Sequence, residues 1–170
     1  MGLMLKEVPQ YEILLERSKG CPELDPSAIE AFLHLLRTST DLFEAFGRVM
    51  ASHAISQGRF IVLVLLNRDP DHPVNPADLA ERANVTRSTM TGLIDTLERA
   101  GFVQREHAPD DRRMMFVRLT TRGRKFLERI LPEYFRRIAA VMGQLTVAER
   151  KTLVGLMAKI QQNLPAVAPR

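Results

Sequence analysis

The sequence predicts a mainly α-helical protein of the α+β class, in which a small head lies between long helices at the two ends of the chain. Two observations predict this fold. In several segments apolar residues recur at intervals of three and four, as they do along an amphipathic helix. Between those segments, residues 75–119 read as two short helices across a tight turn, followed by a two-stranded ribbon. With 45% apolar residues, the 170-residue chain can bury the core of a single domain.

The chain is predicted to start with an arm and a long helix. Residues 1–24 form the arm, with a short helix over residues 10–19 that lies on the same chain or on a partner subunit. The long helix is predicted to run to about His53. Its predicted start signals are Asp25-Pro26 and, directly after them, a capping box formed by Ser27 and Glu30. Its apolar residues share one face: Ile29, Phe32, Leu33, Leu36, Phe43, Phe46 and Met50.

The next helix is predicted from the residues that flank it and not from the spacing of its apolar residues. The consecutive apolar residues from Phe60 to Leu66 suit either a buried strand or a buried helix. Ser56 is a favourable cap before this run, and Asn67 is a favourable stop after it. These two residues favour a buried helix of about three turns.

A helix-turn-helix is predicted after a short loop. Asn75 caps its first helix, and Pro76 takes the first helical position, where a missing N–H costs nothing. Asn84 and Val85 form the turn, with the apolar Val85 facing inward. Thr86 caps the second helix, which a glycine ends.

The second of these helices has two different faces. Its apolar face consists of Met90, Leu93, Ile94 and Leu97. Short hydroxyl side chains and one arginine remain on the outside of its N-terminal end: Thr86, Arg87, Ser88, Thr89 and Thr91. The N-terminal end of a helix carries partial positive charge, and a helix-turn-helix places this end in the major groove of DNA. These five residues are therefore candidate DNA contacts.

The ribbon predicts a second DNA contact. Residues 102–105 and 115–119 read as strands joined by a turn. A hairpin directly after a helix-turn-helix is a wing, which reaches the phosphate backbone or the minor groove. Arg112 and Arg113 lie where the turn meets the second strand, and Asp111 can brace Arg113. Arg113 is expected to enter the minor groove, where A·T-rich segments concentrate negative potential.

Taken together, these motifs resemble the multiple-antibiotic-resistance regulator (MarR) family of winged-helix repressors. The resemblance rests on the segments between Ser56 and Gly123 that read GRFIVLVLL, LAERANVTRSTMTGLIDTLERAGFV, PDDRR and VRLTTRG. It implies a two-fold dimer in which the terminal helices interleave above two winged heads. It also implies a small-molecule effector that is seated between the dimer helices and the head.

Basic residues are concentrated around the wing. The segment from Arg105 to Lys125 contains seven basic and three acidic residues, so its net charge of +4 equals that of the whole chain. Such a run is often a solvated face. Beside a helix-turn-helix, it is interpreted as an electrostatic footprint for nucleic acid.

Two more helices are predicted after the wing. Thr120 or Thr121 caps a long helix that Pro132 interrupts. Thr146 and Glu149 form a capping box at the start of the last helix. The terminal helices carry more apolar surface than one small core can bury, which indicates burial between two chains. The predicted homodimer interface contains Ile29, Phe32, Leu153, Leu156 and Ile160.

The effector implied by the resemblance is predicted to be a small aromatic or anionic molecule. Arg59 directly precedes the apolar run, so its charge lies near a wall of low polarity and can hold a carboxylate. The alternative is that Arg59 pairs with an acidic side chain such as Asp41 or Glu44. The candidate effector residues lie where the first long helix turns into the buried one: Ser52, His53, Ser56 and Arg59.

The sequence carries no sign of an enzyme, a metal site or a bound cofactor. Its four histidines are scattered without metal-ligand spacing, and a glycine-rich phosphate loop is absent. The single cysteine, Cys21, lies in a linker and is interpreted as structural or incidental, with a redox role as the alternative. No signal peptide or membrane-spanning run is present, so a cytoplasmic protein is expected.

The expected function is that of a homodimeric transcriptional regulator, a repressor that binds a palindromic operator in double-stranded DNA and is released by an effector. Two alternatives are a winged-helix protein-interaction module and a nonspecific architectural DNA-binding protein. A docking module would have a more apolar wing tip, and architectural proteins carry a larger basic excess. The chain is divided into the arm (1–24), dimerisation helices (25–55 and 121–164) and a winged helix-turn-helix (56–120), within one domain.

Overall fold

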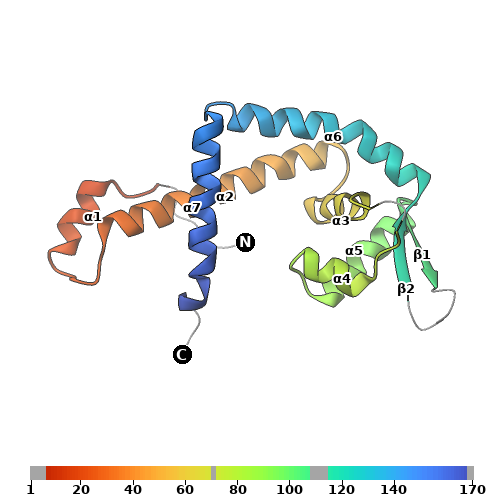
Figure 1. The fold of residues 1–170 in the computed structure, drawn as a ribbon, viewed down its shortest axis with the longest axis horizontal. Helices are drawn as coiled ribbons and strands as arrows, with labels where there is room; N and C mark the ends of the chain where they lie inside the picture. The colour runs from red at the N-terminus through yellow and green to blue at the C-terminus, as the bar shows by residue number, and fades with distance from the viewer. Residues whose placement is uncertain (1–6, 70–71, 108–114, 168–170) are drawn as a thin grey trace.

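The computed structural model describes residues 7–69, 72–107 and 115–167. The elements in chain order are α1 (Tyr11–Ser18), α2 (Pro26–Ser52), α3 (Gln57–Asn67), α4 (Pro76–Arg82), α5 (Arg87–Arg99), β1 (Val103–His107), β2 (Met115–Leu119), α6 (Thr121–Met142), α7 (Val147–Gln162) and the short 3-10 helix η1 (Leu164–Val167). We call α3, α4, α5, β1 and β2 the head. From the head, α2 and α6 extend toward α1 and α7 at the other end of the molecule (Figure 1).

Most helices start at the capping residue that the sequence predicts. The side chains of five residues each accept a hydrogen bond from a backbone N–H in the helix that follows: Ser56, Asn75, Thr86, Thr120 and Thr146. The capping box at the start of α7 is complete, because Glu149 in turn accepts a hydrogen bond from the N–H of Thr146 at 2.7 Å. These caps satisfy N–H groups that have no partner inside the helix.

The predicted capping box at Ser27 and Glu30 is wrong. Asp25 caps α2, and its carboxylate accepts hydrogen bonds from the N–H groups of Ser27 at 2.9 Å and Ala28 at 3.1 Å. The hydroxyl of Ser27 also donates to Asp25, and this bond is the main cause that lowers the pKa of Asp25. Pro26 then takes the first helical position, which suits its fixed φ and missing N–H.

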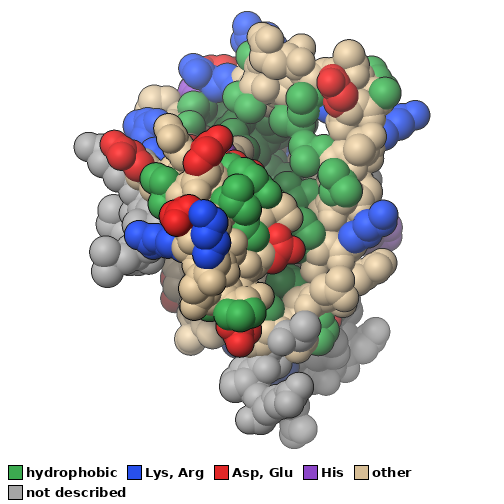
Figure 2. All heavy atoms as spheres, turned by 90° about the vertical axis from the view of Figure 1, so that its left-hand side faces the viewer, with side chains coloured by type: hydrophobic (Ala, Val, Ile, Leu, Met, Phe, Trp, Pro, Cys, Tyr) green, Lys and Arg blue, Asp and Glu red, His purple; other side chains and the backbone are tan. Residues whose placement is uncertain are grey.

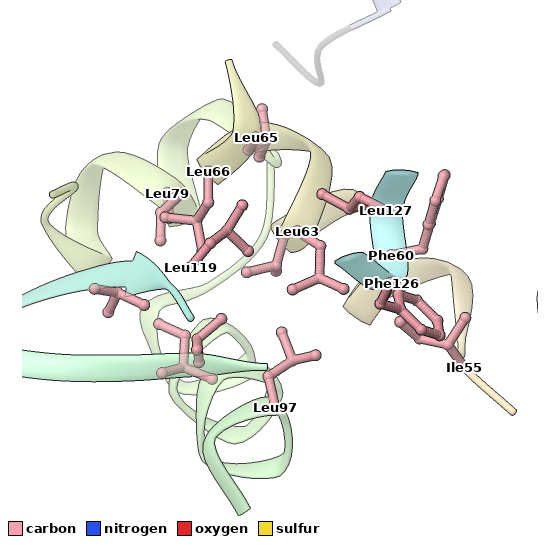
Figure 3. Close-up of a cluster of buried hydrophobic side chains, with 14 of the residues drawn as sticks. Ile55, Phe60, Leu63, Leu65, Leu66, Leu79, Leu97, Leu119, Phe126 and Leu127 are labelled. Carbon is pink, nitrogen blue, oxygen red and sulfur yellow. The ribbon is translucent and has the colours of Figure 1, made fainter. Parts of the chain in front are cut away.

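The core of the head is built around α3. Val62 and Leu63 of α3 have no exposed surface, and α3 contacts α4, α5, β2 and α6. Figure 3 shows Leu63 among side chains contributed by α5, β2 and α6. The buried helix predicted for this run is confirmed. Ile61 is the exception, with 44% of its surface exposed, because a helix packed against one core keeps a side turned away from it.

The ribbon is a two-stranded antiparallel sheet. Its base is the pair Val103 and Leu119, and its far end is the pair His107 and Met115. Val74, just before α4, adds a single bridge to Val117 of β2, with both N–H···O bonds at 2.9 Å. The predicted contacts Asp111, Arg112 and Arg113 belong to residues 108–114, which join the strands and lie outside the described residues.

The base of the ribbon is tied closely to the start of α6. The N–H of Thr120 donates to the carbonyl of Phe102 at 3.0 Å, and the Thr120 hydroxyl donates to the carbonyl of Gly101 at 2.7 Å. Gly123 packs directly on this junction. A Cβ atom at residue 123 would overlap the carbonyl oxygen of Phe102 and lie 3.2 Å from a methyl group of Leu119. This close approach therefore requires glycine.

α2 and α3 meet at a sharp corner. Their axes differ by 83°, and Ala54 in the corner has a φ of 58°, in the left-handed region. The N–H of Ile55 donates to the carbonyl of Met50 at 3.2 Å, and that of Ala54 donates to the carbonyl of Ala51 at 2.9 Å. This is the hydrogen-bond pattern of a Schellman motif. Because Met50 and Ile55 are also buried, both packing and hydrogen bonds fix the corner.

The helices at the end of the molecule away from the head leave large apolar side chains exposed. Phe32 is 57% exposed, Leu156 51% and Ile160 47%, whereas Ile29 and Leu153 are half-buried. α7 has no buried residue. Figure 2 looks at this end and shows hydrophobic side chains spread over it. Among the described residues no single helix is long and apolar enough to cross a membrane, although α2 and α3 meet that test as a bent pair.

Candidate nucleic-acid interface

The N-terminal end of α5 is a polar, exposed surface. Thr86, Arg87, Ser88, Thr89 and Thr91 are all exposed, as the sequence predicts. On the other side of the helix Met90, Ile94 and Leu97 are buried, with at most 1% of their surface exposed. The apolar side thus anchors α5 in the head while its N-terminal end projects its polar residues into solvent.

Most hydroxyl groups on this surface already have partners within α5. The Oγ1 atom of Thr86 accepts the N–H of Thr89 at 3.1 Å and lies 3.0 Å from the Ser88 hydroxyl and 2.8 Å from the Thr89 hydroxyl. The hydroxyl of Thr91 donates to the carbonyl of Arg87 at 2.9 Å. The guanidinium of Arg87 has no ion pair or hydrogen bond to another described residue. Its donors are therefore available to an external acceptor.

The turn between α4 and α5 sets the position of this surface. Asn84 has a φ of 51°, which an asparagine tolerates better than most residues. The N–H of Val85 donates to the carbonyl of Ala80 at 3.0 Å. The prediction that Val85 faces inward is wrong, since 36% of its surface is exposed. The small side chain of Ala80 lies in the core instead, and that of Ala83 packs against it.

Arg105 of β1 joins the ribbon to α5, a role that the sequence analysis did not identify. Its guanidinium donates to Asp95 at 2.5 Å and to Glu98 at 2.5 Å, and its backbone N–H donates to Glu98 at 3.1 Å. Burial disfavours the charged form of Arg105, but the hydrogen bonds to Asp95 and Glu98 outweigh it and raise the pKa of Arg105. The sequence does contain a signal for this contact, namely two acidic residues three positions apart on α5 and an arginine on the strand that follows.

The basic run around the wing divides into two groups in the structure. Arg105 and Arg118 are neutralised by carboxylates, the latter by Glu106 across the ribbon. Arg122 and Lys125 lie on the first turns of α6, at the base of the ribbon. Of these four described residues, only Arg122 and Lys125 are not paired with a carboxylate.

The four candidate effector residues do not share one site. The Ser56 hydroxyl accepts a hydrogen bond from Nε of Arg59 at 3.1 Å, so these two residues are together. Ser52 instead lines a hollow of about 420 Å³ between α2 and α6, which also contains Arg48 and Arg137. His53 lines a different hollow, at the start of α6.

The predicted alternative for Arg59, a pair with an acidic side chain, is not seen. Asp41 is paired with Arg37 on its own helix at 2.7 Å. Among the described residues Arg59 has no carboxylate partner, and its side chain is half-buried. Its charge is therefore available to an anion at the start of α3.

His53 also connects α2 to α6. Its Nε2 atom is buried and lies 3.3 Å from Oε2 of Glu133, with no hydrogen-bond partner among the described residues. Glu133 accepts hydrogen bonds from Arg137 at 2.6 and 3.0 Å. The hydrogen bond from Arg137 is the main cause that lowers the pKa of Glu133, and the charges of Arg137 and His53 add to it. This group of side chains holds the corner of α2 against α6.

Within the described residues no three His, Cys, Asp or Glu side chains come close enough to hold a metal ion. Cys21 is exposed, and its Sγ atom lies 3.5 Å from a carboxylate oxygen of Glu23.

Comparisons with known proteins agree with this geometry. A family model described as "MarR family" matches residues 55–115. The HTH-type transcriptional repressor YetL of Bacillus subtilis is 36% identical over 94% of this chain and 96% of its own length. Sco3205 of Streptomyces coelicolor, a MarR family transcriptional regulator solved in complex with DNA, is 27% identical, with a TM-score of 0.72 over 79% of this chain and 85% of that one. BpsR of Bordetella bronchiseptica, whose DNA binding is regulated by 6-hydroxynicotinic acid, is also 27% identical, with a TM-score of 0.64 over 75% of this chain and 96% of that one.

Proposed function

The chain belongs to the MarR family and is a DNA-binding transcriptional regulator, and we propose that it acts in the cytoplasm as a homodimeric repressor that a small molecule releases from a palindromic operator. The observation that carries this proposal is the exposed N-terminal end of α5, where Arg87 has no partner within the described chain. A helix end with free donors suits base edges and phosphates in the major groove.

The proposed DNA complex has two such ends, one from each protomer. In it, Arg87 contacts base edges, and Thr86, Ser88, Thr89 and Thr91 contact bases or phosphates. Two-fold symmetry requires half-sites about one helical turn apart, roughly 10 base pairs from centre to centre. For the wing, we propose from the sequence alone that Arg113, supported by Asp111, enters the minor groove beside each half-site, and that Arg112 contacts the backbone.

Replacing Arg87 by alanine tests the major-groove contact. We expect Arg87→Ala to weaken operator binding by about 1–3 kcal/mol if the arginine reads a guanine, and to relax the base preference at that position. The measurement is a titration of the operator, recovered by genome-wide DNA pull-down, and of single-base variants of it.

The matched control for this experiment is Arg99→Ala. Arg99 is an exposed arginine on the same helix, but it lies at the C-terminal end and bonds to the Asp95 carbonyl at 3.3 Å. This control should keep operator affinity. Equal losses in both variants would mean that Arg87 acts through general charge and not through base contacts.

For the effector we propose an aromatic acid, and the structure offers two anchors for its carboxylate. Arg59 is the anchor expected from the sequence, and its guanidinium is bonded to Ser56. Arg48 is the second, because it lines the hollow between α2 and α6 together with Phe46 and Val49. An effector releases DNA only if it binds better to a dimer whose α5 helices no longer match the half-sites. A roughly 100-fold preference corresponds to about 2.7 kcal/mol, which empties a moderately occupied operator.

The effector proposal predicts that salicylate-like and other aromatic acids weaken operator binding of the wild-type protein. We expect Arg59→Ala to need at least about tenfold more acid for the same release, because a charge-assisted hydrogen bond is lost. Arg48→Ala is measured beside it. If the acids act and Arg48→Ala alone loses the response, the anchor is in the hollow between α2 and α6. If no aromatic acid weakens wild-type binding, the proposed effector class is wrong.

A further inference from the structure

The core of the head holds the ribbon only at its base. Val103, Val117 and Leu119 are buried there, with at most 3% of their surface exposed. The outer two pairs of the ribbon, which end at His107 and Met115, contain no buried residue. A two-stranded hairpin has little stability of its own. The direction in which the outer part of the ribbon projects therefore depends on contacts with other elements.

Arg105 provides such a contact, because it lies between the buried base and the outer pairs. β1 packs against α5 (Figure 1). Successive side chains of a strand point to opposite faces, so Arg105 shares a face of β1 with the buried Val103. Only 25% of the Arg105 side chain is exposed. Gln104 and Glu106 lie on the opposite face, where Gln104 donates to Glu106 at 2.8 Å. Arg105 therefore faces α5, whereas its two neighbours face away.

Hydrogen bonds to α5 fix both the side chain and the backbone of Arg105. The guanidinium donates to Asp95 and to Glu98, each at 2.5 Å. The backbone N–H of Arg105 also donates to Glu98, at 3.1 Å. Asp95 and Glu98 are three positions apart, so they lie on one face of the helix. Because a guanidinium is planar and its donors form a rigid fork, bonding to two carboxylates restricts its orientation. The bond from the N–H to Glu98 fixes the strand itself.

These bonds contribute to geometry more than to stability. The side chains of Asp95 and Glu98 are 48% and 37% exposed, and ion pairs with this access to water add little to the stability of a protein. Ile94 and Leu97 anchor α5 in the core, with at most 1% of their surface exposed. Without the bonds to Arg105, α5 would therefore remain in place, and the outer part of the ribbon would lose its fixed direction.

We propose that Arg105 is a positioning residue that determines how far from the bases contacted by α5 the wing meets the DNA. This inference rests on the proposed function, because it requires α5 in the major groove and the wing in the adjacent minor groove. Arg87 lies eight residues before Asp95 on the same helix, or about 12 Å along its axis. Through Arg105, the ribbon and the polar end of α5 therefore form one rigid unit.

A rigid unit restricts the operators that each head can bind. A shift of one base pair moves a feature of the DNA by about 3.4 Å. While Arg105 is bonded to Asp95 and Glu98, the ribbon cannot follow such a shift. An operator is then bound tightly only if its A·T-rich flank lies at one distance from the half-site.

The test compares operators in which a short A·T-rich segment lies at successive distances from each half-site, within flanks that are otherwise G·C. We expect the wild-type protein to bind about fivefold or more weakly when this segment is moved by one base pair from its best position. We call the dependence of affinity on this distance the flank profile. The measurement is a titration of each operator with the full-length protein.

Arg105→Lys is the main variant, because it keeps the positive charge but removes the fork that bonds two carboxylates in one plane. We expect its affinities for neighbouring positions of the segment to differ by no more than about twofold. The base preference at the position contacted by Arg87 should stay that of the wild type. Asp95→Asn removes one carboxylate partner of Arg105 and should flatten the flank profile in the same direction. It decides the result if Arg105→Lys does not fold.

The matched control is Arg118→Lys. Arg118 belongs to the same ribbon, but it pairs with Glu106 across the two strands and not with α5. This variant should keep the wild-type flank profile. In an Arg113→Ala background, Arg105→Lys should cause no further change in the profile, because the minor-groove contact that it positions is already lost.

The proposal is overturned if Arg105→Lys keeps the wild-type flank profile, even if it melts at a lower temperature, since its role would then be structural only. It is also overturned if Arg118→Lys flattens the profile as much. A wild type without any preference for the position of the A·T-rich segment would overturn both this inference and the proposed minor-groove contact of the wing. In that case, a base preference that is lost in Arg87→Ala would still support the proposed function.

Discussion

Replacing Leu156 by glutamate is expected to convert the proposed dimer into monomers and to abolish operator binding at concentrations where the wild type is saturated. Leu156 lies on α7, a helix without a buried residue, and is 51% exposed in the single chain. Fully burying a leucine stabilises an interface by about 1.5–3 kcal/mol, and a glutamate at its centre adds an unpaired charge. Because the palindromic operator is bound by the two heads of one dimer, a variant that cannot dimerise also loses operator binding.

The measurement is sedimentation equilibrium together with operator titration. Gln162→Glu adds the same charge to an exposed polar position near the end of α7 and should leave the dimer intact. A wild-type protein that is a stable, folded monomer at micromolar concentration would refute the dimer itself. A Leu156→Glu variant that remains dimeric would show that α7 lies outside the interface.

Gly123→Ala is expected to be strongly destabilising for a change of one methyl group, because Gly123 lies where α6 packs on the base of the ribbon. A Cβ atom at this position overlaps the carbonyl oxygen of Phe102, which is held by a hydrogen bond from the N–H of Thr120. Overpacking of a fixed site costs about 1–3 kcal/mol, and a clash with backbone belongs at the upper end of that range. The expected result is a lower melting temperature and a smaller free energy of unfolding in urea.

Gly92→Ala is the matched control, because it makes the same exchange of glycine for alanine on another helix, α5. Nothing lies within 4 Å of a Cβ atom built at Gly92. Alanine is better by about 1 kcal/mol inside a helix, so this variant should melt higher than wild type. If Gly123→Ala melts like wild type, the start of α6 can shift away from the ribbon and the junction is looser than its contacts indicate.

Helix starts were predictable because capping is local. A cap such as Thr86 bonds to a backbone N–H only three residues later, so the relevant atoms are adjacent in the sequence. The same locality explains why Ser27 misled the prediction. Two acceptable caps, Asp25 and Ser27, stand on either side of Pro26, and the proline decides between them because it favours the first helical position.

Contacts between elements were not predictable from periodicity. Arg105 reaches two carboxylates on α5 that are seven and ten residues earlier, and its sequence position shows only a basic residue on a strand. The charge of the Arg105–Lys125 run was interpreted as a footprint for nucleic acid, and a count of charges cannot show that Arg105 and Arg118 are paired with carboxylates. Ser52 and His53 are neighbours in sequence but line different hollows, since consecutive residues of a helix end point in different directions.

The corner at Ala54 controls the angle between α2 and the head. The pivot is short and stiff, because the left-handed Ala54 is fixed between the buried Met50 and Ile55. The polar end of α5 lies far from this corner, so a small rotation of the head about the corner becomes a larger displacement of α5 at the DNA. Glycine at position 54 would relieve the backbone strain, but it would also allow a wider range of angles between α2 and the head. We therefore expect a stiff corner in each protomer to help fix the distance between the two α5 helices of the dimer, and so to limit the operator spacings that the protein accepts.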